Sequence, residues 1–583
     1  MANRVELLSH GLFEKKLMDS KVTTRTVTKK EKILGHLIGP LGLIFVVNTV
    51  AALVEKFFTQ QATAMYGEGN PMLQTMGGYY EIVMTVAKIL AVGIGLLNGF
   101  LIQHTKSKQG RFRPWYLIFG FGSIAIGALI FLFAGEPAKA MGNAYWYYFF
   151  FMLICYHTVG STFFYLFRDS IVSVATHNAK EKAQLKFIRM VSWTLISGIV
   201  IGMLVSTVLI PFWLEKSLSG YFILLIILSV VAVPLLLMEY FFTKERVIED
   251  VAQEVGLENE NKIPLKQQIK ALMTNKYFVI LMVLATIGGI IDNFKGGNVQ
   301  YFYVKFMLDG VNHGERFMMF SIITGIPLGL GAIGIYPLAR KIGIKNLSII
   351  GYSLILVGAI IGWIFPSNLY VVYAAGFLKQ VGYLPHAYIF ATLLCYAYDD
   401  IEFKSKMRLE GLMGVAIIVA IQQLMYAPCA GGYESLLLKL GFADGEGIMA
   451  SETVQGFMTM AFYLCDIILA VASLILLPFV NVEKKLPEIN AELERRRKEA
   501  VLARGEEWVS SEEQEKREAE QAEREHEENR IADLRERCQR KGLDFDTENQ
   551  KYLTNKAEKE RKWQEKQDAK KAKKEAREQA KKK

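Results

Sequence analysis

The stretch from Gly220 to Phe242 reads GYFILLIILSVVAVPLLLMEYFF, and Glu239 is its only charged residue. An α-helix needs about 20 such apolar residues to cross the hydrocarbon core of a bilayer. Similar runs recur along the 583-residue chain, which is 52% hydrophobic. A soluble chain of this length divides into several domains whose elements each keep a polar face. The sequence therefore predicts an all-α membrane protein that crosses the bilayer many times.

Twelve apolar runs are long enough to span a membrane, and polar loops separate them. In the first half of the chain we expect spans at 33–57, 79–103, 114–134, 145–173, 187–213 and 220–242. In the second half we expect them at 277–303, 317–339, 346–365, 369–397, 410–438 and 454–480. The longer, amphipathic loop between the two groups indicates two six-helix bundles.

Cationic side chains gather in the N-terminal segment and in alternate loops, for example at Lys30, Lys108, Lys182, Lys341 and Lys406. Because cytoplasmic loops carry the excess of Lys and Arg, this alternation places both termini in the cytoplasm. It predicts a multi-pass protein of the inner or plasma membrane, with the lipid bilayer as a partner. The net charge of +10 follows from this pattern, so no nucleic-acid partner is expected.

The chain divides into five parts. We expect a cytoplasmic N-terminal segment at 1–32, a first bundle at 33–242, a cytoplasmic middle loop at 243–276, a second bundle at 277–481 and a charged cytoplasmic tail at 482–583. Basic, glycine-containing loops follow the second span of each half, at 103–115 and 337–345. Such loops at corresponding positions indicate a parallel internal repeat, although any tight cytoplasmic loop needs glycine and cations.

The composition changes at about Val482, and Glu, Lys, Arg, Ala and Gln dominate the rest of the chain. Opposite charges four residues apart favour a solvated helix. The tail has no sustained apolar seam of the kind that a coiled coil requires. Two interpretations stay open, a solvated helix with a disordered end or an arm that binds a protein partner or anionic lipid.

Three charged loops carry more specific motifs. Residues 110–115 read GRFRPW just before the third span, and residues 180–185 read KEKAQL ahead of Arg189. Residues 399–404 read DDIEFK, and residues 408–411 read RLEG. Together they resemble the glycoside–pentoside–hexuronide:cation symporters, the melibiose-carrier relatives within the major facilitator superfamily. The resemblance covers roughly residues 30–480 and implies a twelve-helix major facilitator fold that moves a glycoside or related small hydrophilic solute by alternating access.

We assign these loops a conformational role. Ion pairs of Glu402 or Glu410 with Arg408 or Arg113 would latch the two bundles together in one state of a rocking carrier. The alternative is that they are ordinary positive-inside loops. The residues with this assignment are Gly110, Arg111, Arg113, Pro114, Asp399, Glu402, Arg408 and Glu410.

The chain departs from the resemblance at the cation site. The two aspartates that the family carries on its second helix correspond to Ala91 and Gly95, and its eleventh-helix lysine corresponds to Gln422. The fourth-helix aspartate of the sugar site corresponds to Tyr165, with Asp169 one turn further on. Joint loss of carboxylates and lysine leaves no unpaired buried charge. We therefore expect coupling to protons or another monovalent cation, or uncoupled transport, and no sodium coupling through the usual site.

Charged residues inside a membrane are costly, so they mark functional sites. Aromatic faces beside polar side chains suit the apolar ring faces and hydroxyl groups of sugars. On these grounds the substrate-binding candidates are Tyr165, Asp169, Arg189, Trp193, Asp292, Lys295, Lys379, Tyr383, Gln422 and Tyr426. Glycines around Asp292 and Lys295 indicate an interrupted helix, although these two charges could simply neutralise each other.

His386 lies near the middle of its span and is the candidate for proton coupling, because histidine changes its charge near neutral pH. The alternative is a hydrogen-bonded structural histidine. The sequence contains no P-loop, no GxSxG elbow, no HExxH and no metal-spaced cluster, so we expect no enzyme, no cofactor and no metal.

Two functions other than glycoside transport stay open. A carrier of an amphipathic solute such as a lysolipid predicts an apolar cavity that opens to lipid. A non-transporting membrane sensor or scaffold predicts no central cavity and a tail that binds a protein.

Overall fold

The computed structural model describes residues 27–67, 70–103, 105, 110, 112–176, 184–186, 188–189, 191–196, 205, 208–245, 264–296, 298–308, 313–406, 413–444 and 450–503. In the tail it describes 520, 524, 527–528, 530–531, 534–535, 538–539, 542–555, 557–558, 561 and 565. The chain forms two units, of which the larger contains Lys29–Glu506 and the smaller contains Glu507–Lys583.

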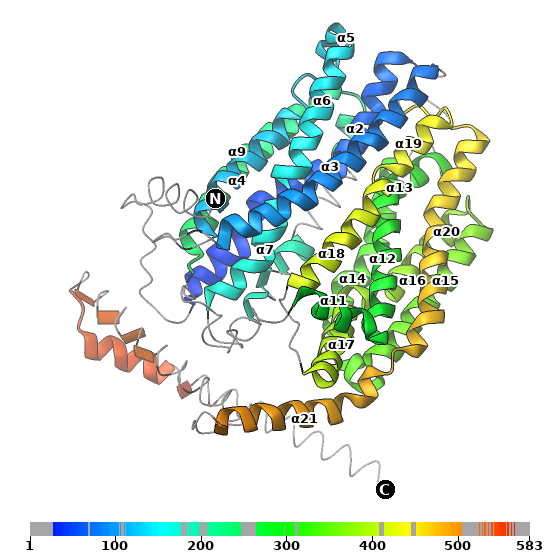
Figure 1. Cartoon of the computed structure of the whole chain (residues 1–583). Coiled ribbons are helices and arrows are strands. Elements are labelled where there is room, and N and C mark those ends of the chain that lie inside the picture. The colour runs from blue at the N-terminus through cyan, green and yellow to red at the C-terminus, as the bar shows by residue number, and fades with distance from the viewer. Residues whose placement is uncertain are drawn as a thin grey trace. The chain divides into compact units, whose positions relative to one another are not determined.

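The first half of the larger unit is helical throughout its described residues (Figure 1). Its elements are η2 (Glu31–Ile38), α2 (Leu41–Tyr66), α3 (Pro71–Gln103), α4 (Arg113–Leu129), α5 (Glu136–Met141), α6 (Asn143–Cys155), η3 (Tyr156–Gly160), α7 (Thr162–Ala175), η4 (Val191–Ile196) and α9 (Leu218–Phe242). Aromatic side chains fill its core, where Phe57 lies edge-on to Phe131 and Tyr116 stacks on Phe167.

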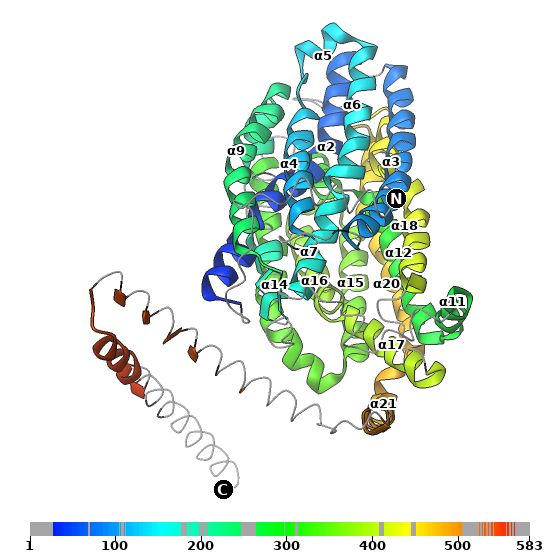
Figure 2. The same ribbon diagram turned by 60° about the vertical axis from the view of Figure 1, so that its left-hand side comes forward.

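The second half follows the same plan. Its elements are α11 (Leu265–Thr274), α12 (Lys276–Lys295), α13 (Val299–Tyr303), η7 (Val304–Leu308), α14 (His313–Ile342), α15 (Ile344–Ile364), α16 (Leu369–Tyr388), α17 (Phe390–Ser405), α18 (Met413–Tyr426), η8 (Ala427–Cys429), α19 (Gly432–Lys439), α20 (Glu452–Leu476), η9 (Leu477–Phe479) and α21 (Val482–Ala503). We call the end that carries α5 and α19 the upper end, and the end that carries α11, α17 and α21 the lower end (Figures 1 and 2).

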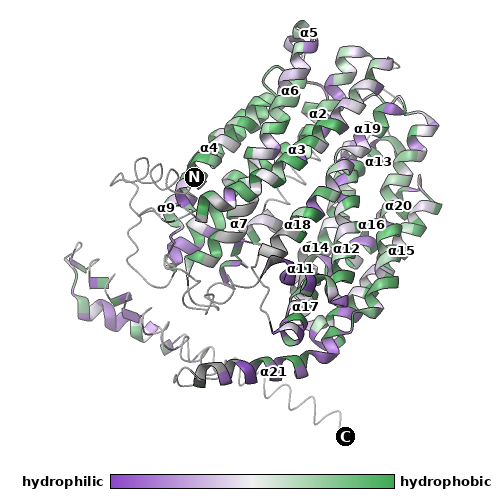
Figure 3. Ribbon diagram, viewed as in Figure 1, coloured by the Kyte–Doolittle hydropathy of each residue, from purple (hydrophilic) through white to green (hydrophobic). Residues whose placement is uncertain are grey.

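The long helices present apolar side chains outward. Ile82 on α3, Val230 on α9 and Ile364 on α15 are each more than half exposed. Among the described residues, six helices are long and apolar enough to cross a membrane, and hydrophobic residues cover most of their length (Figure 3). Exposed apolar surface of this extent requires lipid around it. The expected span at 187–213 lies largely outside the described residues, so the count of twelve stays a prediction.

One structural device occurs once in each half. Gly110 has a φ of +104° and precedes α4. The N–H groups of Phe112, which caps this helix, and of Arg113, its first residue, donate to Glu245 Oε1 at 2.9 and 3.0 Å. Gly343 has a φ of +89° and precedes α15, whose Ile344 N–H donates to Glu483 Oε1 at 2.6 Å. Each glutamate follows the last long helix of its half and satisfies free N–H groups at a helix start.

Helices α15 and α16 approach closely because glycines line their contact. A Cβ atom on Gly351 would overlap the carbonyl of Gly382, and one on Gly382 would overlap the carbonyl of Gly351. Lipid-embedded helices gain little from the hydrophobic effect, so they associate through small residues that permit dense packing. This contact holds α15 behind α16, which carries residues of the site described below.

The first part of the expected tail packs on the second half. Val482, Ile489 and Leu493 on α21 are buried in the apolar core of that half. They lie on one helix face together with Leu486, and Arg496 donates to the Phe403 carbonyl of α17 at 3.0 Å. The smaller unit contains helical residues 545–555, where Arg530 lies over the ring of Tyr552.

Candidate functional site

The apolar helix α12 ends inside the second half at Lys295. Gly296 follows with a φ of +59°, and α13 starts only at Val299. The helix interruption expected from the local glycines is therefore present, and Gly297 lies outside the described residues. A broken helix exposes backbone groups and turns side chains toward a cavity.

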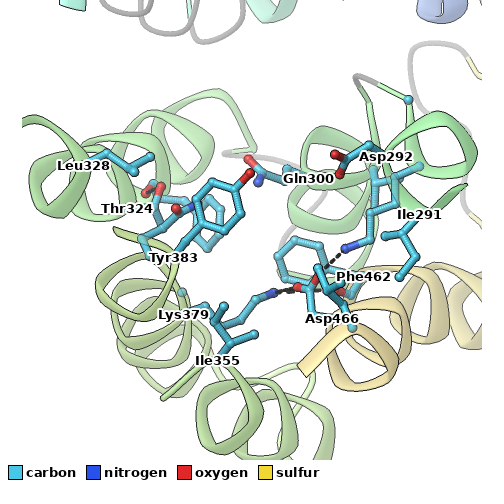
Figure 4. A pocket seen from close by; sticks show the side chains of 17 residues that line it. Ile291, Asp292, Gln300, Thr324, Leu328, Ile355, Lys379, Tyr383, Phe462 and Asp466 are labelled. Carbon is cyan, nitrogen blue, oxygen red and sulfur yellow. Dashed lines mark hydrogen bonds and ion pairs between the residues drawn. The ribbon is translucent and has the colours of Figure 1, made fainter. Parts of the chain in front are cut away.

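A cavity of about 510 Å³ adjoins this interruption (Figure 4). Small-molecule sites commonly have volumes of about 300–1,000 Å³. Residues from α12, α13, α14, α15, α16 and α20 line it, and four of them are charged, namely Asp292, Lys295, Lys379 and Asp466. The two cations and two anions give the cavity no net charge.

Asp466 on α20 bridges the two lysines. Its Oδ1 lies 2.5 Å from the Lys295 Nζ, and its Oδ2 lies 2.5 Å from the Lys379 Nζ. The Lys379 ammonium also lies over the Phe462 ring, 4.2 Å from its centroid. Lys295 thus pairs across helices with Asp466, and the simple neutralisation by Asp292 that the sequence left open is not the arrangement found.

Asp292 and Gln300 are exposed to the cavity space. In Figure 4 they lie with Tyr383 on the side opposite Lys379 and Asp466. A carboxylate accepts hydrogen bonds from hydroxyl groups, and a lysine ammonium donates them. The rings of Phe320, Tyr383 and Phe462 add apolar faces. The cavity therefore offers both kinds of contact that a sugar needs.

Four of the predicted substrate-binding residues meet here, namely Asp292, Lys295, Lys379 and Tyr383. Asp466 was missed by sequence reasoning, although a carboxylate within the expected span 454–480 carried the same signal as Asp292. Thr324 and Gln300 gave no such signal, because uncharged polar residues are common in spans.

Two other candidates pack between helices of the same half. Gln422 donates to the Thr286 hydroxyl at 3.0 Å, and Tyr426 donates to the Ala285 carbonyl at 3.4 Å. These bonds join α18 to α12. His386 lies 2.7 Å from the Tyr352 hydroxyl through its Nδ1, an arrangement that corresponds to the structural alternative for this residue.

The candidates of the first half lie elsewhere. Arg189 forms a buried ion pair with Glu239 at 2.8 Å, near the lower end of α9. Trp193 stacks on Phe164 with ring centroids 5.2 Å apart. The side chains of Tyr165 and Asp169 lie outside the described residues.

The predicted conformational residues are described only in part. Arg113 donates to the Tyr240 carbonyl at 2.7 Å, a contact within the first half, and Pro114 lies in the first turn of α4. Asp399 and Glu402 lie on α17 at the lower end. Arg111, Arg408 and Glu410 lie outside the described residues, so the latch expected among these loops stays a prediction.

A different set of ion pairs joins the two halves at the upper end. Lys56 Nζ of the first half lies 2.9 Å from Asp444 Oδ2 of the second. Lys305 Nζ of the second half lies 2.7 Å from Glu215 Oε1 of the first. His313 also contacts Glu215, at 3.0 Å. We call Lys56, Glu215, Lys305 and Asp444 the upper latch.

The two carboxylates of the upper latch lie in loops between spans. Burial acts to raise the pKa of Glu215, but the Lys56 ammonium, the contact with His313 and the Lys305 ammonium outweigh it and hold this pKa well below its usual range. For Asp444 burial is likewise outweighed by Lys305 and Lys56, so its pKa is lowered. Both carboxylates are therefore ionised at neutral pH.

The described residues contain no group of three or more His, Cys, Asp or Glu side chains arranged to hold a metal ion.

Comparison with known proteins agrees with this geometry. The sequence profile of the MFS/sugar transport protein family matches residues 35–484. The chain belongs to this family. Among its relatives are the isoprimeverose transporter of Lactiplantibacillus pentosus, 26% identical over 78% of this chain and 89% of that one, and the raffinose carrier protein of Pediococcus pentosaceus, 25% identical over 74% and 67%.

A solved structure supports the fold of this MFS/sugar transport protein. The crystal structure of a D-xylose-proton symporter matches with a TM-score of 0.54 and 13% identity, over 78% of this chain and 98% of that one. The all-α major facilitator fold and the multi-pass membrane character expected from the sequence are confirmed. The family's members are transporters, which agrees with the prediction of a non-enzyme.

Proposed function

We propose that this chain is a cation-coupled secondary transporter that carries a neutral glycoside of two or three sugar units by alternating access. The observation that supports it most is the charge-balanced cavity beside the α12–α13 break, where Asp292 and Gln300 face open space and aromatic rings flank them. Such a site suits a neutral sugar, because a few placed polar groups orient it and apolar walls cover its ring faces. The names of the isoprimeverose and raffinose carriers agree in substrate class.

The upper latch indicates which state of the transport cycle this structure represents. Alternating access requires one end of the paired bundles to close while the other opens. With the lower end in the cytoplasm, as the basic loops favour, the protein is closed toward the outside. Both termini then lie in the cytoplasm, and the protein resides in the plasma membrane or its bacterial inner-membrane equivalent.

The amphipathic-solute alternative fits this cavity poorly. An acyl chain requires an apolar lining, whereas four charged side chains line the space here. Desolvating these groups against a hydrocarbon chain is unfavourable. The cavity also argues against a scaffold without a transport path.

The test is uptake into proteoliposomes of radiolabelled isoprimeverose, raffinose and lactose, each with a pH gradient, a sodium gradient or no gradient. We expect saturable uptake of at least one sugar, driven by the pH gradient. Asp292→Asn is expected to weaken uptake, while Glu452→Gln, at an exposed site at the start of α20, is the control. Absence of uptake of every sugar under every gradient would contradict the proposal.

A further inference from the structure

Two carboxyl groups from opposite halves meet near the upper latch, since Glu55 directly precedes Lys56. Glu55 lies on α2 and is 6% exposed, and Glu434 lies on α19 and is fully buried. The Glu55 carboxyl and the Asn298 amide face the Glu434 carboxyl, together with a backbone N–H group. This buried acid pair is separate from the cavity charges and from the upper latch.

The Glu434 carboxyl is poorly satisfied. Neither of its oxygens makes a hydrogen bond of good geometry within the described part of the chain, and the same holds for Nδ2 of Asn298, which is 2% exposed. Two ionised carboxylates side by side in a buried site repel each other strongly. A proton on one of them turns this repulsion into a hydrogen bond between the two carboxyl groups.

A single proton would balance the formal charges around the pair. Tyr80 and Lys88 on α3 and Tyr433 on α19 act on the pair electrostatically. Lys88 is the cation among them, so one proton brings the set of Glu55, Glu434 and Lys88 to zero net charge. Two ionised carboxylates would leave one uncompensated negative charge.

The pair exists only while the upper end is closed. Glu55 belongs to the first half and Glu434 to the second, and the surfaces beside them are in close contact. Glu81 on α3 accepts a hydrogen bond from Ser435 at 3.0 Å and pairs with Lys439 at 2.7 Å. Separation of the halves would expose both carboxyl groups to water, where each ionises independently at neutral pH.

The pair also adjoins the candidate site. Gly296 lines the cavity, and a Cβ atom built on it would overlap the Glu55 carboxylate on its other side. Gly296 at the α12–α13 break therefore contacts both Glu55 and the space assigned to the sugar. A shift of this break on sugar binding would act directly on Glu55.

We propose that Glu55 and Glu434 form a proton-binding site shared by the two halves, and that closure of the upper end requires one proton bound there. The closed state binds this proton more tightly than the open state, so by linkage acid pH favours closure. The inference rests on the proposed function in one respect, that this proton is the coupling ion of sugar transport.

The test of the site needs no sugar. Spin labels at Met141 and Leu440, exposed residues of opposite halves at the upper end, report the opening by double electron–electron resonance. The full chain is used with its five native cysteines replaced by alanine. It also carries His313→Gln, so that the imidazole in contact with Glu215 contributes nothing to the pH response.

We expect short distances at low pH and a rise in the open population of up to about tenfold per pH unit as pH increases. Glu434→Gln, which mimics the protonated side chain, is expected to stay closed between about pH 5 and pH 7.5, and Glu55→Gln provides an independent second variant. Glu81→Gln removes another carboxylate from the same interface and is expected to keep the pH response. A pH-independent parent, or a response that survives both Gln variants, overturns the proposal.

A metal cation is the competing ligand. The contrary result is that sodium chloride closes the upper end at high pH where choline chloride does not. That result would show that Glu55 and Glu434 bind sodium, and it would refute the proposal of a proton site. Sugar uptake then separates the two proposals. Uptake without a pH response refutes the proton site alone, whereas a pH response without uptake of any tested sugar refutes the proposed function alone.

Discussion

Lys56 of the first half and Asp444 of the second lie 2.9 Å apart and are almost completely buried. Each also has a partner in its own half, since Lys56 lies 3.2 Å from Glu215 and Lys305 lies 3.0 Å from Asp444. When the halves separate, a neutral pair remains on each side. The upper latch can therefore open without leaving a buried charge unpaired, which is the usual penalty for breaking a buried ion pair.

A charge swap within the first half tests this latch. Lys56→Glu combined with Glu215→Lys keeps a neutral pair in that half but makes both contacts between halves repulsive. We expect the upper end to open and sugar uptake to fall at least about tenfold, the effect of about 1.4 kcal/mol. Adding Lys305→Asp and Asp444→Lys reverses the second half as well and is expected to restore closure and much of the uptake. Failure of the fourfold variant to recover closure, while it still folds, would contradict the latch.

The upper latch is expected to withstand acid. Because the pKa values of Glu215 and Asp444 are lowered, their stabilising contribution is present at neutral pH and is lost only as the pH falls through these lowered values. Closure of the Glu434→Gln variant, measured by the Met141–Leu440 distance, should therefore not change between about pH 7.5 and pH 5. Opening of this variant on mild acidification would show that the latch carboxylates titrate in the ordinary range.

Asp466 bridges two ammonium groups in the cavity. Asp466→Asn leaves Lys295 and Lys379 facing each other without their counter-ion, which we expect to cost about 3–5 kcal/mol of stability and to abolish sugar uptake. Thermal unfolding in detergent and proteoliposome uptake measure the two effects.

The control for Asp466→Asn separates folding from binding. Asp466→Asn combined with Lys379→Met removes one of the two opposed cations. It should recover part of the lost stability but not the uptake. Recovery of both would assign Asp466 a purely structural role.

The sequence predicted the fold better than the site. Apolar runs such as 220–242 identify spans wherever they are long, because the bilayer forces a length and a composition on them. Glycines around Asp292 likewise predicted the break at Gly296. These signals are local, so neighbouring residues alone reveal them.

Which charged side chains pair with each other depends on how distant helices pack, and the sequence did not predict these pairs. Asp292 and Lys295 are neighbours on one helix, yet Lys295 pairs with Asp466 from α20. Glu55 on α2 and Glu434 on α19 lie 379 positions apart, and the packing of α19 against α2 brings them together. Likewise the sequence predicted Arg189 as a substrate-binding residue, whereas in the structure it forms an ion pair with Glu239. An ionisable residue in a span signals a function or a partner, but not which of the two.

In each half a glycine with positive φ precedes a helix start that a glutamate caps, and we expect substitution of this glycine to lower the stability of the fold. Gly110→Ala places a side chain at a φ of +104° and against the Glu245 carboxylate. We expect a loss of about 2 kcal/mol, from a strained backbone and a displaced helix cap, and Gly343→Ala should behave similarly. Gly122→Ala, within the helix α4 that follows Gly110, meets no atom within 4 Å and is the control. Equal unfolding temperatures for the Gly110 and Gly122 variants would refute the account.

His386 offers the last discriminating variant, because the sequence made it the coupling candidate. In the structure its Nδ1 lies 2.7 Å from the Tyr352 hydroxyl, and its ring packs on Tyr383 and Phe390. A glutamine can keep a hydrogen bond to Tyr352 but cannot carry a proton. If Glu55 and Glu434 hold the coupling proton, His386→Gln should retain accumulation driven by a pH gradient, and Glu434→Gln should only equilibrate the sugar. If instead His386→Gln abolishes accumulation and Glu434→Gln retains it, His386 carries the coupling proton. The glutamine keeps the hydrogen bond to Tyr352, so the loss of the titrating group would be the cause.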